Sequence, residues 1–248
     1  MIVQLSVFNT MRAMLENNAS LWLYGLRTTL LLAFVGTVVG LLLALVLVVM
    51  KIQIPRRDAH FMKRILVRLV RRTSILYVGF FRGTPMMVQA MLLYYGLQSL
   101  GLGIPVFTAG LVVVSLNTAA YLTEVLRAGL AALHKGQKEA ALALGMSPYA
   151  TYRFVLFPQA LKNMVPAIGN ELVVNLKDTA VLSVIGVTEM FYMGRRIGSA
   201  RYQFTESFII VSLLYLLVVN IAVWLLGKLT NMRTRRASIP RSDSGVMT

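Results

Sequence analysis

The chain has 248 residues, of which 57% are hydrophobic and only 14% are charged, and its mean hydropathy is +0.71. Because soluble domains carry about 25% charged residues, this composition excludes an ordinary soluble protein and indicates a membrane protein. The chain has no cysteine, which excludes disulfides, thiol catalysis and cysteine-based metal sites.

Apolar stretches without charge divide the chain into candidate membrane helices. Thr28 to Met50 contains no charged residue over 23 positions, and Gly83 to Thr123 contains none over 41. Since a helix needs roughly 20 apolar residues to cross a bilayer, the second stretch is long enough for two spans, with a break near Pro105. The sequence therefore predicts an all-α membrane protein with five spans. They cover about residues 24–50, 83–100, 106–127, 163–187 and 207–227.

The first apolar stretch and the two histidines each have two possible interpretations. A signal peptide would have an apolar region of about 7–15 residues near its start. The first stretch is longer and begins further from Met1, so we interpret it as a retained helix. His60 and His134 lie far apart in basic stretches, which favours solvated residues over metal ligands.

The net charge of +16 collects in a few stretches. Between residues 51 and 72 there are eight basic residues and one acidic residue, Asp58, and further basic residues lie in 127–162 and 228–241. Lysine and arginine accumulate on the cytoplasmic side of membranes, so five spans place the N-terminus outside and the C-terminus in the cytoplasm. This rule explains the segment 51–72 better than nucleic-acid binding does.

The segments that flank the first span are predicted to be short helices at the membrane surface. They comprise residues 1–23 and 51–75, and the second mixes apolar with basic residues, as suits a helix on an anionic membrane surface. An ordinary basic loop fits that pattern equally well. No repeat or linker divides the chain, so we expect one membrane domain, 24–230, followed by a basic tail, 231–248.

The stretch after the third span predicts a rigid, bent loop at residues 135–158. Lys138 to Leu144 are strong helix formers, and Gly145 can end their helix in the left-handed conformation. Ser147 and Pro148 suit the N-cap and the first position of a second helix. Two short helices with a sharp bend could dock a soluble partner. A structured loop without a partner is the alternative.

The same loop carries a family resemblance. Glu139, Ala140, Ala141, Gly145 and Pro158 resemble the EAA loop of permeases in binding-protein-dependent ABC importers. Other motifs in the same order resemble the polar amino-acid branch of that family: Phe81-Arg-Gly-Thr-Pro85 with Gln89, Ser115 to Tyr121, Arg127-Ala-Gly129, Leu176 to Thr179 and Leu182 to Ile185. The chain departs from the branch at Gly79, where Glu is common, and in the basic insert 51–72.

The resemblance implies a five-helix type I ABC importer permease bundle in the bacterial cytoplasmic (inner) membrane. It also implies three protein partners: an ATP-binding subunit seated on the loop, an extracytoplasmic solute-binding protein, and a second permease, the same or homologous. ATP and magnesium belong to the partner subunit, since this chain has no Gly-x-x-x-x-Gly-Lys-Ser/Thr loop and is not expected to bind a cofactor or act as an enzyme.

Other classes of function remain as alternatives. A secondary, ion-coupled transporter would usually show inverted repeats, and none is visible in the sequence. An ABC permease for a different small polar solute is a second alternative. It would account equally well for the motifs that are not specific to the polar amino-acid branch. A membrane-embedded enzyme would need a nucleophile with its base, or a metal cluster, within the spans, and we find neither there.

Polar residues within the predicted spans are candidates for a solute pathway, because such groups are costly in a membrane. Glu171, Asn175 and Asp178 have the spacing of one helix face. We predict a substrate pathway lined by six residues: Gln89, Asn117, Tyr121, Glu171, Asn175 and Asp178. Interhelical hydrogen bonding is the alternative role for such groups. Glu124 and Arg127, three residues apart, are predicted to form a structural ion pair.

Overall fold

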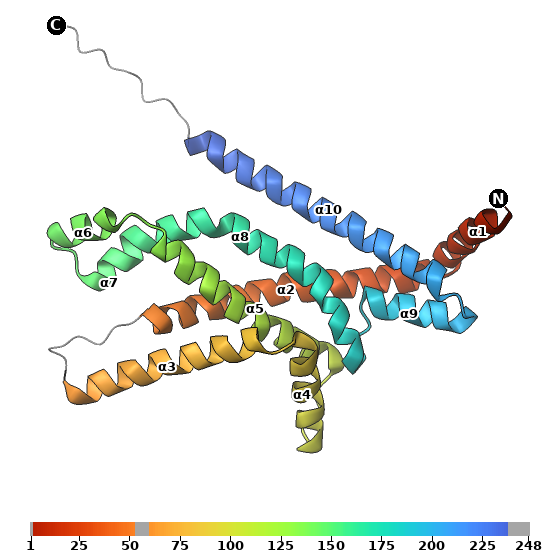
Figure 1. The fold of residues 1–248 in the computed structure, drawn as a ribbon, viewed down its shortest axis with the longest axis horizontal. Helices are drawn as coiled ribbons and strands as arrows, with labels where there is room; N and C mark the ends of the chain where they lie inside the picture. The colour runs from red at the N-terminus through yellow and green to blue at the C-terminus, as the bar shows by residue number, and fades with distance from the viewer. Residues whose placement is uncertain (1, 53–59, 238–248) are drawn as a thin grey trace, which may run out of the picture.

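The computed structural model describes residues 2–52 and 60–237, and within these every regular element is a helix. This confirms the predicted all-α class (Figure 1). The elements are α1 (Ile2–Asn17), α2 (Ala19–Ile52), α3 (Phe61–Gly83), α4 (Met86–Ser99), α5 (Val106–Ala131), α6 (Lys135–Ala143), α7 (Pro148–Ala150), the π-helical turn η1 (Thr151–Leu156), α8 (Phe157–Asp178), the 3-10 helix η2 (Thr179–Ile185), α9 (Met190–Arg201) and α10 (Phe204–Ala237). Arg56, Arg57, Asp58 and most of the predicted basic tail lie outside the described residues.

Three described helices are long and apolar enough to cross a membrane: α2, α5 and the part of α10 from Phe204 to Leu229. They correspond to the first, third and fifth predicted spans. The predicted span 83–100 is bounded differently, because α3 ends at Gly83 and α4 has 14 residues, too few to cross alone. Pro85, which lacks an N–H group, precedes α4 at this break. The predicted span 163–187 is divided between α8 and η2.

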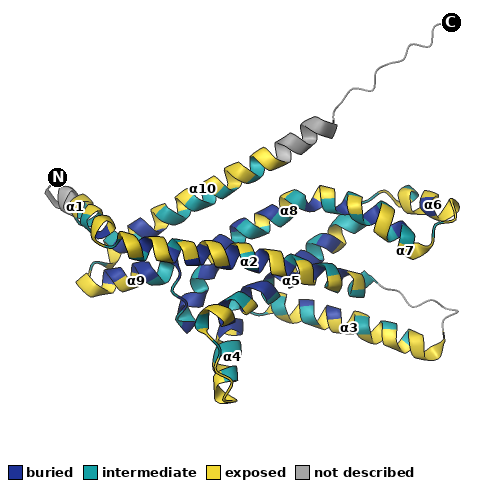
Figure 2. Ribbon diagram, turned by 180° about the vertical axis from the view of Figure 1, so that it is seen from behind, coloured by how far each residue is buried: buried dark blue, intermediate teal, exposed yellow. Residues whose placement is uncertain are grey.

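The centre of the fold is the close contact between α2 and α5 (Figure 1). Gly36 and Gly40 of α2 face Val114 and Thr118 of α5, and a Cβ atom on Gly40 would lie 2.7 Å from the Thr118 methyl carbon. Two helices can approach this closely because small residues remove the side chains between them. Figure 2 shows buried residues along α2, which contacts α5, α8 and α9.

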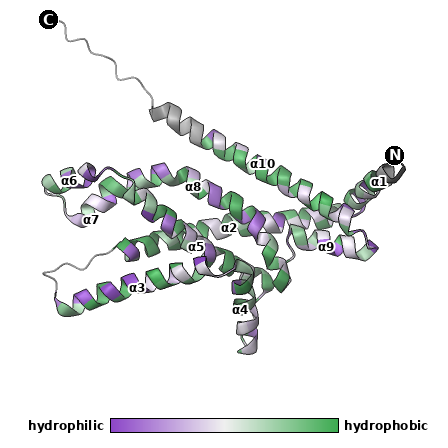
Figure 3. Ribbon diagram, in the orientation of Figure 1, coloured by the Kyte–Doolittle hydropathy of each residue, from purple (hydrophilic) through white to green (hydrophobic). Residues whose placement is uncertain are grey.

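The periphery of the fold exposes a large apolar surface. Helix α10 runs away from α8 toward its C-terminal end, and its hydropathy is high along most of its length (Figures 1 and 3). Leu213, Leu216, Leu217 and Ile221 on this helix are each about half exposed. Contiguous apolar surface on this scale requires lipid or another subunit as its neighbour.

Candidate functional site

The loop after α5 forms a bent module whose first helix ends as predicted. Gly145 adopts the left-handed conformation with a φ of 81°, and its N–H donates to the carbonyl of Leu142 at 3.0 Å. The next N–H, of Met146, donates to the carbonyl of Ala141 at 3.1 Å. These two bonds satisfy the last carbonyls of α6 in the Schellman arrangement, which needs a residue that tolerates positive φ.

The second helix of the module also begins as predicted. Ser147 is its N-cap and accepts a hydrogen bond from the N–H of Ala150 at 3.2 Å, with Pro148 at the first position. The chain then passes through η1 into α8, where Pro158 lies in the first turn. The first helix, predicted from Lys138, begins at Lys135 because the ring nitrogen of His134 accepts from the Gly136 N–H. The first helix and the bend are confirmed, whereas the second helix is not a separate short one, because α7 continues through η1 into α8 without a break.

The module lies at one end of the molecule, away from α4 and α9 (Figure 1), and several of its apolar side chains are exposed. Leu144 is 84% exposed, Tyr149 is 74% exposed and Phe154 is 66% exposed. Of the EAA-like residues, Ala141 is buried, whereas Glu139, Ala140, Gly145 and Pro158 are exposed. A rigid bend with uncovered apolar residues has the character of a docking surface.

Gln89 and Asn117 lie together at the break between α3 and α4. The amide nitrogen of Gln89 donates to the carbonyls of Phe81 and Thr84, both at 2.9 Å. Asn117 of α5 donates to the side-chain oxygen of Gln89 at 3.0 Å. Carbonyls at the end of α3 have no partner within that helix, so these amides satisfy them and fix the break. Both candidate pathway residues therefore also hold helices together.

Asn175 joins three helices in the buried centre. Its amide nitrogen donates to the hydroxyl of Thr37 in α2 at 2.8 Å and to that of Thr118 in α5 at 2.9 Å. The side chain is almost completely buried. These contacts match the interhelical alternative, and a pathway role for Asn175 stays a prediction.

Glu171, Asp178 and Tyr121 are the candidate pathway residues with the most freedom to contact a solute. Glu171 is half-buried and Asp178 is exposed, and neither carboxylate forms a hydrogen bond or salt bridge with another described residue. The two carboxylates interact electrostatically, as does Lys177 with Asp178. Tyr121 is 39% exposed, and the guanidinium of Arg82 lies 5.4 Å from its ring centre.

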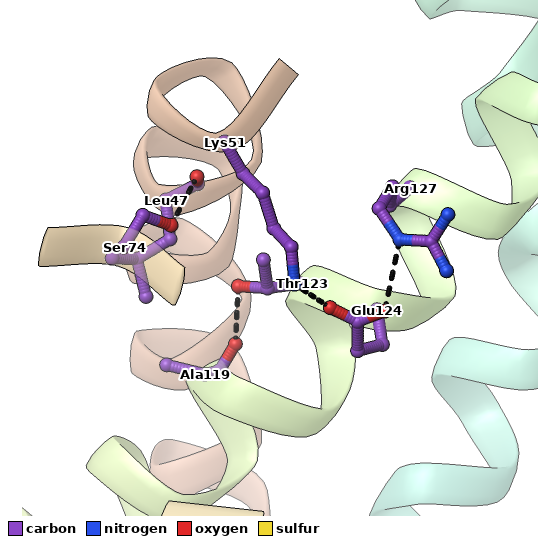
Figure 4. Close-up of polar contacts among 7 residues, drawn as sticks. All are labelled: Leu47, Lys51, Ser74, Ala119, Thr123, Glu124 and Arg127. Atoms are coloured by element: carbon purple, nitrogen blue, oxygen red, sulfur yellow. Dashed lines mark hydrogen bonds and ion pairs between the residues drawn. The ribbon is translucent and has the colours of Figure 1, made fainter. Parts of the chain in front are cut away.

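The predicted ion pair between Glu124 and Arg127 is confirmed, with 2.9 Å between the carboxylate and the guanidinium (Figure 4). Sequence reasoning missed its third member: the ammonium group of Lys51, at the end of α2, pairs with the same carboxylate. Nearby, the hydroxyl of Ser74 in α3 donates to the Leu47 carbonyl of α2 at 2.9 Å. Lys51 is 73 residues from Glu124, so only the packing of α2 on α5 brings them together.

Glu189 is a second residue that sequence reasoning missed. Its fully buried side chain caps α9 by accepting from the N–H groups of Phe191 and Tyr192, both at 2.7 Å. The hydroxyl of Tyr215 in α10 also donates to it, at 2.9 Å. Burial raises the pKa of Glu189 to about 7, and these hydrogen bonds act in the opposite direction. The only signal in the sequence was its place directly before a helix.

Comparison with known proteins identifies the family of this chain. Residues 60–236 match the family described as "Binding-protein-dependent transport system inner membrane component". The arginine transport system permease protein ArtQ of Bacillus subtilis is 40% identical over 204 residues, which cover 82% of this chain and 88% of that protein. The glutamine transport system permease protein GlnP of Escherichia coli is 34% identical over 163 residues, covering 65% of this chain and 74% of that protein.

Solved structures share the fold. A crystal structure described as an amino acid ABC transporter with histidines has a TM-score of 0.79 and 34% sequence identity, and the match covers 88% of this chain and 96% of the other. An inward-facing methionine ABC transporter, MetNI, has a TM-score of 0.71 at 22% identity, which shows the common fold alone. The chain belongs to the family of binding-protein-dependent transport system inner membrane components, as a permease subunit of an amino-acid ABC importer.

Proposed function

We propose that this permease crosses the bacterial cytoplasmic membrane five times, with its N-terminus outside and its C-terminus in the cytoplasm. Helices α2, α5 and α10 supply three of the spans. The other two combine shorter elements, α3 with α4 and α8 with η2. The clusters of basic residues after the first and third spans and near the C-terminus support this orientation, since each then faces the cytoplasm.

The observation that carries the mechanism is the bent module with exposed Leu144, Tyr149 and Phe154. We assign it to the ATP-binding subunit, whose closure would push the module and, through η1, move α8 as one unit. ATP then shifts the bundle between inward-open and outward-open forms by favouring one of them. A second permease, the same or homologous, completes the enclosure, because one copy leaves α10 largely uncovered.

The transported solute is a polar amino acid delivered by an extracytoplasmic binding protein. The unpaired carboxylates of Glu171 and Asp178 suit the amino or guanidinium groups of such a solute, and Tyr121 with Arg82 supplies an aromatic face and a cation. Relatives named for arginine and glutamine transport support this class.

Reconstitution tests the proposal directly. The permease, its ATP-binding subunit and its binding protein are placed in proteoliposomes, and uptake of radiolabelled arginine and glutamine is followed with and without ATP. We expect uptake of at least one of them that requires ATP and the binding protein. ATP-independent uptake driven by an ion gradient would contradict the proposal and support the ion-coupled alternative.

A further inference from the structure

The first half of α3, residues 61–73, carries a cluster of basic side chains without partners. The cluster comprises Lys63, Arg64, Arg68, Arg71 and Arg72, and α3 contains no acidic residue. Within the described part of the chain, none of these five side chains takes part in a salt bridge or a hydrogen bond. By contrast, Arg12, Lys51 and Arg127 each pair with a glutamate. The charge of this half-helix is therefore uncompensated where the structure describes its neighbours.

Four of these basic residues share one side of the helix. Arg64, Arg68, Arg71 and Arg72 have the spacing i, i+4, i+7 and i+8, which places them on one face. Three of them are exposed and Arg64 is half-buried. The arginine face is thus open to a partner over two helical turns.

An exposed apolar stripe runs beside the arginine face. Its members are more than 40% exposed and recur at helical spacing: Met62, Ile65, Leu66, Leu69, Leu76 and Phe80. The buried residues of α3 are Ser74 and Val78, which lie on its inward face. No residue from 61 to 73 is buried. Residues 2–52 and 60–237, which the structure describes, cover neither the stripe nor the arginine face.

The position of this half-helix relates it to the bilayer surface. Ser74 bonds to the Leu47 carbonyl near the end of α2, and Phe61 lies about 20 Å further along the helix at 1.5 Å per residue. In Figures 1 and 2 this part of α3 extends past the end of α2. Each headgroup layer is about 5–8 Å thick, and arginine side chains extend along a helix so that the charged group stays in water. Arg68, Arg71 and Arg72 therefore lie within reach of headgroups.

We propose that residues 61–73 bind anionic phospholipid headgroups through Arg68, Arg71 and Arg72. A bilayer surface offers both acyl chains for the exposed apolar side chains and negative charges for the basic flank. An acidic protein surface would match the arginines but not the exposed apolar side chains beside them, such as Leu66 and Leu69. This inference goes beyond the transport role and rests on the proposed crossing of α2, whose C-terminal end marks the bilayer surface.

Lipid enrichment around the purified transporter tests the proposal. The complete complex is reconstituted in nanodiscs with equal amounts of phosphatidylglycerol and phosphatidylcholine, and the lipids retained after mild detergent extraction are quantified by mass spectrometry. We expect wild type to retain more phosphatidylglycerol than phosphatidylcholine, and we expect that excess to be lost when the three arginines are replaced and to weaken with salt. The test variant is R68Q/R71Q/R72Q. The charge-keeping variant R68K/R71K/R72K should retain most of the enrichment.

The matched control is R195Q/R196Q/R201Q, which removes the same charge from exposed arginines of α9. It should leave the enrichment unchanged. Equal enrichment in wild type and R68Q/R71Q/R72Q would overturn the proposal, as would an equal loss in the control. Unchanged lipid with loss of the ATP-binding subunit from the purified complex would overturn it in favour of a protein contact. Size-exclusion profiles confirm that each variant is folded.

Discussion

The amide nitrogen of Asn175 lies 2.9 Å from the hydroxyl oxygen of Thr118, and this hydrogen bond ties α8 to α5 in the buried centre of the fold. The same amide reaches Thr37 of α2, so one side chain joins three helices. Interhelical hydrogen bonds in membranes contribute about 0.6 kcal/mol each on average.

Replacing Asn175 by Leu, which has a similar volume, should therefore lower the free energy of unfolding by about 1–2 kcal/mol. Thermal unfolding in detergent measures this as a decrease of several degrees in Tm. The matched control is Asn220→Leu, since among the described residues the exposed Asn220 amide bonds only to the Leu216 carbonyl of its own helix. Equal effects of the two changes would mean that the three-helix contact does not stabilise the fold.

The close contact between Gly40 and Thr118 predicts that an added methyl group at Gly40 lowers the stability of the fold. A methyl group at Gly40 would lie 2.7 Å from the Thr118 methyl carbon, so Gly40→Ala should destabilise by about 1–3 kcal/mol. Thr118→Ser removes that methyl carbon and keeps the hydroxyl, so it should partly rescue Gly40→Ala. As a control, Gly79→Ala should be neutral or stabilising, because nothing lies within 4 Å of an added methyl group there. Thermal unfolding of the four variants distinguishes these outcomes.

The left-handed conformation of Gly145 predicts that a β-branched residue at this position weakens the coupling of ATP hydrolysis to solute import. A β-branched residue there costs about 1–2 kcal/mol, which shifts the population of the bent form roughly tenfold. We expect Gly145→Val to reduce solute imported per ATP hydrolysed, measured in proteoliposomes, while the chain still assembles. Gly145→Asn should be much milder, since Asn tolerates positive φ. Normal coupling in Gly145→Val would refute the role of this bend.

The unpaired carboxylate of Asp178 is expected to contact the solute, so its removal should change the KM for uptake. If it contacts a cationic group of the solute, Asp178→Asn removes a charged hydrogen bond worth about 1.5–3 kcal/mol. The KM for arginine uptake should then rise about tenfold or more, with a smaller effect on glutamine. Glu206→Gln is the matched control, because Glu206 is also a carboxylate without a hydrogen bond or salt bridge among the described residues. Unchanged KM values for both solutes would assign Asp178 to structure.

Local chemistry made parts of this protein predictable from sequence. Gly145, Ser147 and Pro148 act through the backbone of their immediate neighbours, so the bent module could be derived residue by residue. Glu124 and Arg127 pair within one helix, which spacing alone predicts. The all-helical class followed from long apolar stretches, because a membrane requires internally satisfied backbones.

Tertiary packing decided the rest. Gln89, Asn117 and Asn175 have the spacing of pathway residues, yet their amides bond to other helices, and only the arrangement of α2, α4, α5 and α8 reveals which atoms they meet. Lys51 likewise meets Glu124 through packing. The sequence by itself determined the helical membrane class and the bend around Gly145, because helix propensity, apolar length and capping act locally. Which polar groups bind helices and which stay unpaired depended on distances between segments far apart in the chain.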